Sequence, residues 1–482
     1  MLSDKFEKMT DYIVARYKDI EKRILRSLAS SGIQHRTGAS SGLWLGPLTG
    51  LSATATILNE SVGAGYSEIC LLTGITGIGL AVACVCLYGR LAMKKVVVKD
   101  FQLVYFLPAM ITSILYLLLG NKGLLVSVAW GLGVGILGTW GVLQSMACFP
   151  HCFTIGEASA VVHGIILFLL STAANLPYRY HLPPIREDNI ITVILQVGIL
   201  YVASICILCT FFPHLRVGRN FYATALGVLL LAVIPLLHIL LDQSPLHWII
   251  FFIFSDFKRI ILISYWMVCV AFAIGAIARQ ILLNSQASTA IRKHFHVLAV
   301  LVYIPGMIYD PSLLYLASGT IMCLFLMLEI IRILGQPPLG DLLQKGFSVF
   351  ADNKDSLVSL TPLYLLCGLS FPLWMPASNL DLLSLLSGVL TVGLGDTAAS
   401  FVGSNWGKHK WSSCEKSIEG TLACILIQLT VVYCLGYFGY VEGFVTLVKA
   451  TLSIIGISIV EARTDQIDNL ALPLLMYLAL RI

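Results

Sequence analysis

Charge is the scarcest feature of this 482-residue chain, because Asp, Glu, Lys and Arg together make up only 12% of it. Soluble domains carry about 25% charged residues. Hydrophobic residues make up 57% before the 40 glycines are counted, and the mean hydropathy is +0.87. This composition excludes a soluble enzyme, a disordered protein and a nucleic-acid binder. We therefore predict a chain that lies mostly within a membrane.

The apolar runs do not alternate with polar residues, so the sequence lacks the pattern of a membrane β-barrel. Lipid offers no partners to backbone polar groups, which leaves helices as the spanning elements. Apolar runs recur from Leu43 to the C-terminal residues. At about 20 residues per span they predict an all-α polytopic membrane protein with roughly 13–15 transmembrane helices.

Several other signals are also missing. The thirteen cysteines are scattered and form neither a disulfide framework nor a zinc motif. Residues 1–36 carry eight Lys/Arg and no apolar core, so they are not a secretory signal. No internal repeat is evident, which disfavours an inverted-repeat transporter. We divide the chain into a polar N-terminal segment (1–40), a multi-helix region (41–285) and a C-terminal region (286–482) that carries the chemistry.

Chemically distinctive polar residues gather in four segments of the C-terminal region: 291–296, 328–356, 395–421 and 461–469. Two predicted helices separate each segment from the next, so all four should meet on one side of the membrane. They hold nine basic residues, and the turns expected on the other side hold none. The positive-inside rule makes the shared side cytosolic.

The segment 395–421 is the strongest chemical signal. Asp396 and Thr397 end an apolar run and are followed by small residues, glycines and lysines. Glycines let backbone N–H groups approach phosphate oxygens, and lysines supply point charges. A carboxylate beside them would bind Mg²⁺ together with substrate phosphates. The pattern suits a nucleoside triphosphate site without matching a P-loop. A flexible basic loop is the alternative.

Two further clusters accompany it. Glu461, Asp465 and Asp468 are spaced to share one face of a helix, where they would form a metal-ligand set or a solvated helix end. Arg292, Lys293, His294 and His296 suit phosphate binding or acid–base chemistry, with His296 and Asp310 as candidate bases. Glu329 and Arg332 are spaced for an ion pair within one helix.

Four weaker signals remain. Asn59-Glu60-Ser61 fits a glycosylation acceptor but abuts a helix, Asp352 and Asp355 suit a loop cap, and Glu157 and His163 fall within an apolar run.

The order Asp396-x-x-Ala399-x-x-x-Gly403-x-x-x-Gly407, followed by Lys416-Ser417-x-Glu419-Gly420, resembles the CTP-binding signature of the polyprenol kinase and cytidylyltransferase superfamily. Within it the chain most resembles the eukaryotic dolichol kinase family, with further support from 291–296, 328–340 and 461–474. One departure is Glu415, where the family often has a second lysine.

The resemblance implies transfer of the γ-phosphoryl group of CTP to the terminal hydroxyl of dolichol, at the cytosolic face of the endoplasmic reticulum membrane, for glycosylation and GPI-anchor synthesis. It implies Mg²⁺, CTP and dolichol as ligands within membrane lipid, no nucleic acid, and leaves oligomeric partners open. The implied catalytic residues are Asp396, Asp465, Asp468 and His296. The implied CTP contacts are Arg292, Lys293, Thr397, Ser400, Gly403, Gly407, Lys408, Lys410, Lys416, Ser417, Glu419 and Gly420. The implied metal ligands are Asp396, Glu461, Asp465 and Asp468.

Three alternatives stay open at this point. A CDP-lipid synthase of the same superfamily would attack the α-phosphate of CTP and release pyrophosphate. A kinase of another isoprenoid alcohol, such as phytol, would use the same residues. A transporter, the different-class alternative, would place charges in mid-helix rather than in the loops.

Overall fold

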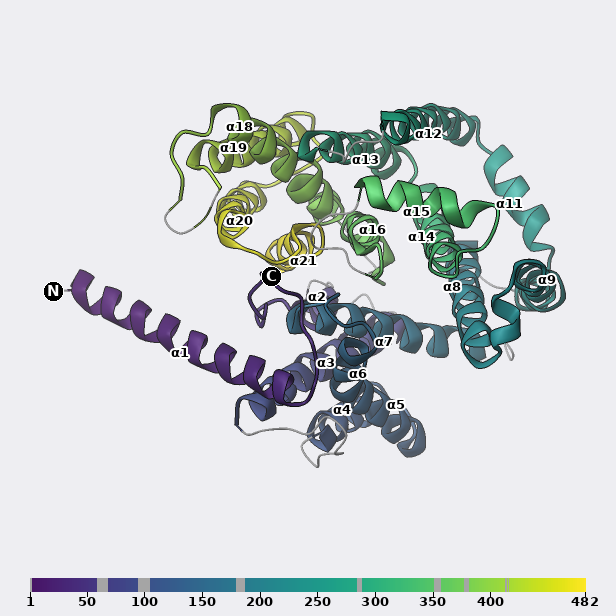
Figure 1. Ribbon diagram of the computed structural model, residues 1–482, viewed down its shortest axis with the longest axis horizontal. Helices are drawn as coiled ribbons and strands as arrows, with labels where there is room; N and C mark the ends of the chain where they lie inside the picture. The colour runs from purple at the N-terminus through teal and green to yellow at the C-terminus, as the bar shows by residue number, and fades with distance from the viewer. Residues whose placement is uncertain are drawn as a thin grey trace. The chain divides into compact units, whose positions relative to one another are not determined.

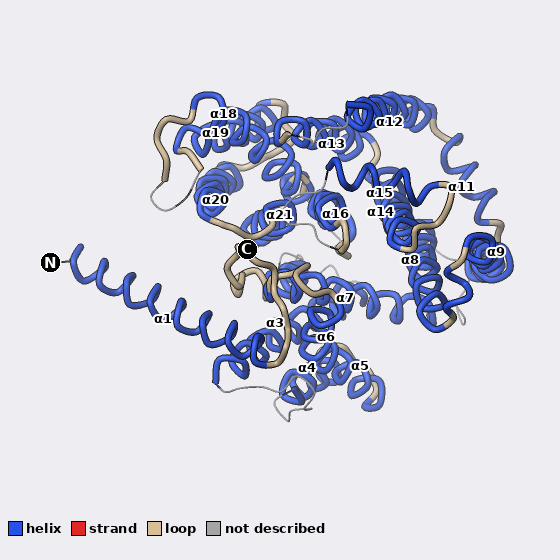
Figure 2. The backbone as a smooth tube through the Cα atoms, in the orientation of Figure 1, coloured by secondary structure: helices blue, strands red, loops and turns tan. Residues whose placement is uncertain are grey.

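The structure is a computed structural model, and it describes residues 2–58, 68–93, 105–178, 187–283, 288–350, 357–376, 381–411, 414 and 416–482. Helices dominate these ranges (Figure 2), where the strand-type pairing is a single bridge between Lys410 and Ser417. Glu415, the acceptor sequence at Asn59, and the Asp352 and Asp355 cap lie outside the described residues. All thirteen cysteines are free, which agrees with the absence of a disulfide framework.

The predicted all-α polytopic architecture is confirmed. Among the described residues, ten helices are long and apolar enough to cross a membrane, and four more apolar helices are shorter, at 10–17 residues. The prediction of 13–15 spans rests on a count of apolar runs. Such a count does not distinguish helices that are long enough to cross a membrane from the shorter apolar helices.

Packing divides the chain into two compact units. Unit 1 is made of residues 1–171, 376–378 and 481–482, and unit 2 of residues 172–375 and 379–480. This division is distinct from the predicted functional boundary near residue 285, which stays a prediction. The helices of unit 1 (Figure 1) are α1 (Leu2–Ser30), α2 (Leu48–Leu58), α3 (Glu68–Met93), α4 (Phe106–Leu118), α5 (Leu124–Ile136), the π-helix η2 (Leu137–Gly141), α6 (Val142–Cys148) and α7 (Ile155–Tyr178), which runs past its boundary.

One residue of the N-terminal segment, Arg36, lies in the core of unit 1. Arg36 Nη2 lies 2.5 Å from Glu157 Oε1, and both side chains are almost fully buried. Glu157 Oε2 also accepts the backbone N–H of Thr154 at 3.0 Å, where α7 begins. Farther along α7, the Nε2 atom of His163 lies 3.3 Å from the Gly138 carbonyl oxygen of η2. Both ionisable side chains of α7 are thus held by structural partners.

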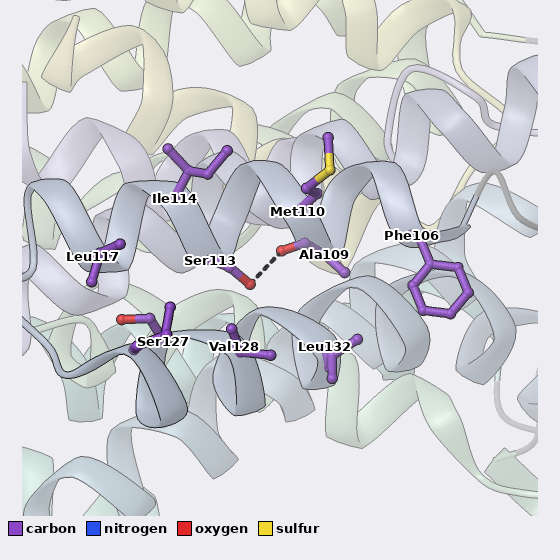
Figure 3. A pocket seen from close by; sticks show the side chains of 10 residues that line it. Phe106, Ala109, Met110, Ser113, Ile114, Leu117, Ser127, Val128 and Leu132 are labelled. Atoms are coloured by element: carbon purple, nitrogen blue, oxygen red, sulfur yellow. Dashed lines mark hydrogen bonds between the residues drawn. The ribbon is translucent and has the colours of Figure 1, made fainter.

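A groove of about 350 Å³ runs along α4 and α5 in unit 1. Figure 3 shows its lining, which is apolar apart from the hydroxyls of Ser113 and Ser127. Ser113 donates to the Ala109 carbonyl of its own helix at 2.8 Å. The groove carries no charged side chain, so it lacks the groups that phosphate chemistry needs.

Unit 2 holds every residue of the predicted site. Its helices are α8 (Glu187–Phe211), η4 (Pro213–Arg216), α9 (Gly218–Val228), η5 (Leu229–Val233), α10 (Ile234–Leu241), α11 (Pro245–Phe254), α12 (Phe257–Leu283), α13 (Thr289–Tyr309), α14 (Pro311–Ile333), α15 (Leu339–Phe350), α16 (Leu360–Trp374), α17 (Leu382–Leu385), the π-helix η6 (Val389–Asp396), α18 (Thr397–Trp406), α19 (Ile418–Tyr437), α20 (Phe444–Arg463) and α21 (Asp468–Arg481).

The π-helix η6 packs closely against three helices because Gly388, which precedes it, and its own Gly393 and Gly395 each leave room for a different neighbour. A Cβ on Gly388 would lie 2.4 Å from the Gly368 carbonyl of α16, and one on Gly393 would lie 2.5 Å from Val300 of α13. A Cβ on Gly395 would lie 2.7 Å from Gln428 of α19. Wide π-turns of this kind are frequent at functional sites. Here the turn ends at Asp396 and fixes that residue among three helices.

Candidate active site

The first part of the site joins α13 to the end of η6. Ser288 caps α13 and accepts the N–H of Ile291 at 3.4 Å, so Lys293 and His296 fall on adjacent turns of one face. Lys293 forms an ion pair with Asp396 Oδ2, and His296 Nδ1 lies 3.5 Å from the same oxygen. Two polar segments that the sequence analysis expected to meet are therefore in direct contact.

Asp396 is only 3% exposed. Burial by itself would raise the pKa of this carboxyl, but the Lys293 ammonium and the His296 imidazole outweigh it and hold the pKa well below its usual range. The carboxylate is therefore ionised at neutral pH despite its burial. A buried charge with dedicated partners is a recognised mark of a functional site.

A polar cluster that sequence reasoning missed lies behind this carboxylate. The Gln428 amide donates from Nε2 to Cys424 Sγ at 3.1 Å and to Ser458 Oγ at 3.3 Å, and the same Nε2 is the atom that approaches Gly395. Gln428 is 1% exposed. The sequence does offer a signal for this cluster, namely a glutamine within an apolar run. Polar side chains inside a membrane usually have a functional role.

The second part of the site joins the α18–α19 loop to the end of α20. Lys416 Nζ lies 2.5 Å from Glu461 Oε1 and 2.7 Å from the Glu461 backbone oxygen. Burial works to lower the pKa of the Lys416 ammonium, but Glu461, with smaller contributions from Asp468 and Asp396, raises it above its usual value. The Lys416 ammonium is therefore favoured in its charged form by Glu461, Asp468 and Asp396 together.

The expectation that Glu461, Asp465 and Asp468 share one helix is wrong. Helix α20 ends at Arg463, and α21 begins at Asp468. Between them the Thr464 hydroxyl accepts the N–H of Gln466 at 3.2 Å, a side-chain turn that competes with helix continuation. Asp465 is exposed, whereas Glu461 is buried.

The glycines of the signature bring α18 against the start of α19. A Cβ on Gly407 would lie 2.4 Å from the Gly403 carbonyl and 2.6 Å from Ser417 Oγ. Ser417 caps α19 by accepting the Gly420 N–H at 3.1 Å. Ser400 and Thr397 lie on α18, and the Thr397 Oγ1 atom is buried without a hydrogen-bond partner among the described residues.

Glu419, at the start of α19, binds the loop that connects α18 to α19 through His409. Its Oε1 lies 2.7 Å from His409 Nδ1, and both carboxylate oxygens accept the His409 backbone N–H at 3.1 and 3.2 Å. Lys408 and Lys410 on this loop are both exposed. Glu419 therefore shapes the loop, and its carboxylate is already engaged there.

Gly407→Ala should lower the thermal stability of the detergent-solubilised protein and raise KM for the nucleotide, because its methyl group would push α18 from Ser417. Overpacking of this kind costs about 1–3 kcal/mol. Gly227→Ala is the matched control, since a Cβ there meets nothing within 4 Å. A Gly407→Ala protein as stable and as tight for nucleotide as the Gly227→Ala protein would contradict this packing role.

The part of the chain that the structure describes has no group of three or more His, Cys, Asp or Glu side chains placed to hold a metal ion. A cation at this site would therefore take one or two carboxylates and complete its shell with phosphates, as Mg²⁺ commonly does. Asp396, with the unpartnered Thr397 hydroxyl beside it, fits such an oxygen-rich site.

Comparisons with known proteins point to one family. A family model described as dolichol kinase matches residues 141–362. The dolichol kinase of Mus musculus is 34% identical over 357 residues, which cover 69% of this chain and 65% of the relative. Dolichol kinase EVAN of Arabidopsis thaliana is 30% identical over 394 residues, covering 73% of this chain and 68% of the relative. The chain belongs to the dolichol kinase family.

A more distant match is a phytol kinase of Synechocystis sp., 35% identical over 91 residues, or 18% of this chain and 39% of the relative. No solved structure matches. The alignment with the mouse dolichol kinase spans just under two thirds of that protein. The dolichol kinase family model covers Lys293 and His296 but ends before Asp396.

Proposed function

We propose that this chain phosphorylates dolichol, transferring the γ-phosphoryl group of CTP to the terminal hydroxyl and releasing CDP. The observation that carries the proposal is the buried Asp396 carboxylate between Lys293 and His296. Family membership and the CTP-type signature around it support the same activity. Family membership also supports a location in the endoplasmic reticulum membrane, and the basic segments around the site support its cytosolic side.

Phosphoryl transfer asks the protein mainly for positioning and for positive charge. Lys416 supplies a point charge to the triphosphate, and Lys293 supplies a second when phosphate approaches Asp396. The dolichol hydroxyl attacks the γ-phosphorus, the bridging bond to the β-phosphate breaks, and CDP leaves. His296, oriented by Asp396 through Nδ1, accepts the hydroxyl proton on its other nitrogen.

Asp396 and the Thr397 hydroxyl would hold a divalent cation together with the phosphates, and the cation would neutralise charge that develops on the leaving group. The substrate alcohol stays in the bilayer, so it reaches these residues from the hydrocarbon side while CTP arrives from water.

Purified protein given dolichol and CTP labelled at the γ-phosphate should place the label in the lipid fraction. CTP labelled at the α-phosphate should leave its label in CDP. Label from the α-phosphate entering lipid, with release of pyrophosphate, would indicate a CDP-lipid synthase and overturn the proposal.

The phytol kinase match favours one second candidate, a kinase of a shorter isoprenoid alcohol. Parallel assays with dolichol and phytol separate the two. We expect the higher kcat/KM with dolichol. A higher kcat/KM with phytol would identify phytol as the preferred substrate, and the proposed phosphoryl-transfer chemistry would be unchanged.

A further inference from the structure

Helix α1 carries an apolar stripe along its whole length. Positions three or four residues apart fall on one face of a helix. The stripe consists of Leu2, Phe6, Met9, Ile13, Tyr17, Ile20, Ile24 and Leu28. The rest of the helix is polar, with seven Lys/Arg and five Asp/Glu in residues 2–30.

Four side chains of the stripe, from Tyr17 to Leu28, have a described exposure, and it rises away from the C-terminal end of the helix. Ile24 and Leu28 are fully buried, whereas Ile20 is 42% exposed and Tyr17 is 38% exposed. Figure 1 shows the C-terminal end of α1 beside the other helices of unit 1 and its N-terminal end extending away from them. The same face therefore passes from a protein contact to an open surface.

The covered end lies at the boundary of a membrane span. Helix α3 is a candidate span. Tyr17 of α1 lies near enough to Tyr88, close to the C-terminal end of α3, to influence it electrostatically. Arg90 follows Tyr88 in α3, and Lys94 and Lys95 come next in the sequence, which marks this end as the basic, water-facing one. Glu21 of α1 accepts the N–H and hydroxyl of Ser41 at 2.7 and 2.9 Å. These contacts connect the C-terminal half of α1 to the segment before α2 and to the basic end of α3.

The spacing of the stripe argues against a second copy of α1 as its partner. From Leu2 to Leu28 the chain advances 26 positions in seven steps, or about 3.7 residues per step, which exceeds the 3.5 of a left-handed coiled coil. A strict heptad continued from Phe6 through Met9 and Ile13 would place Arg16 and Arg23 on the seam. A straight helix on a flat surface accommodates the observed stripe.

We propose that α1 is an interfacial helix that lies on the bilayer, with its stripe among the acyl chains and its basic side chains on anionic headgroups. An amphipathic helix of about 20–30 residues that is polar on balance and has more Lys/Arg than Asp/Glu shows the properties of this class. The proposal concerns a lipid-binding surface and is independent of the phosphoryl-transfer site.

A photo-crosslinking amino acid in the full-length protein tests this surface. It is placed at Ile20, on the stripe, or at Lys22, on the opposite face, and the protein is reconstituted in phosphatidylcholine vesicles with or without phosphatidylserine. We expect lipid adducts at least about fivefold more abundant at Ile20 than at Lys22, with the excess larger in anionic vesicles and reduced by salt. Ile13→Asp should lower the yield at Ile20, because it puts a charge into the stripe.

Chain-to-chain adducts at Ile20 would overturn the proposal in favour of a second copy. Equal yields of lipid adducts at Ile20 and Lys22 would overturn it as well. If the excess at Ile20 were the same with and without phosphatidylserine, the proposed contact of basic side chains with anionic headgroups would be wrong. A kinase assay on the same vesicles keeps the two questions separate, since loss of lipid adducts with full activity bears on α1 alone.

Discussion

Asp396→Asn should lower the rate of phosphoryl transfer from CTP to dolichol about 100- to 1,000-fold, the range typical of removing a preorganised electrostatic group. The substitution keeps the side-chain size and removes only the charge that Lys293 and His296 face. It leaves the Lys293 ammonium without its partner and removes the anion that lies 3.5 Å from His296 Nδ1. Initial rates with saturating CTP and dolichol measure the effect.

The matched control is Asp310→Asn. Asp310 also forms a partly buried ion pair, with Arg259 Nε at 2.6 Å, and caps α14 by accepting the Leu313 N–H. It lies at the opposite end of α13 from His296, about 20 Å along the helix axis, so the sequence-based view of Asp310 as a base has no geometric support. We expect full activity from Asp310→Asn, and equal losses in both variants would remove Asp396 from its catalytic role.

Lys416→Met should lower kcat/KM for CTP by about 100-fold or more, because in the proposed mechanism its ammonium supplies a point charge to the triphosphate. It is also the only cation facing buried Glu461 among the ion pairs of the described residues. Methionine keeps much of the apolar stem. Steady-state rates over a range of CTP concentrations separate the effect on KM from the effect on kcat.

Lys408→Met is the comparison for this second variant, since Lys408 lies on the same loop and is exposed. A loss confined to Lys416 identifies it as the triphosphate contact, whereas a similar loss at Lys408 would point to the loop as a whole. The double variant Lys416→Met with Glu461→Gln tests how much of the damage comes from leaving Glu461 unpaired. Recovery of stability without recovery of kcat/KM would assign the kinetic loss to Lys416.

Much of the site could be predicted from the sequence because its parts obey simple periodicities. Lys293 and His296 are three residues apart, and paired helices return the chain to the same face, so their meeting with Asp396 follows from counting. The ion pair of Glu329 and Arg332 also follows from helical spacing, and the structure has it at 2.7 Å.

Other features depend on contacts that spacing does not encode. The break between α20 and α21 comes from a Thr464 side-chain turn, which local apolar periodicity hides. The packing of Gln428 against Gly395 joins two helices through a close approach that neither sequence reveals alone. The position of Arg36 inside unit 1 could not be expected either, because an arginine in a polar N-terminal segment normally stays in water.

The pair of Arg36 and Glu157 also sets an order of events during synthesis, since its members are 121 positions apart in the chain. At the usual elongation rates, about 6–24 s separate the emergence of the two residues. Through that interval Arg36 has no acidic partner from α7 and must wait outside the hydrocarbon while α2 to α6 are made. The Arg36 side chain, although among the first translated, therefore reaches its buried partner only after α7 has been made.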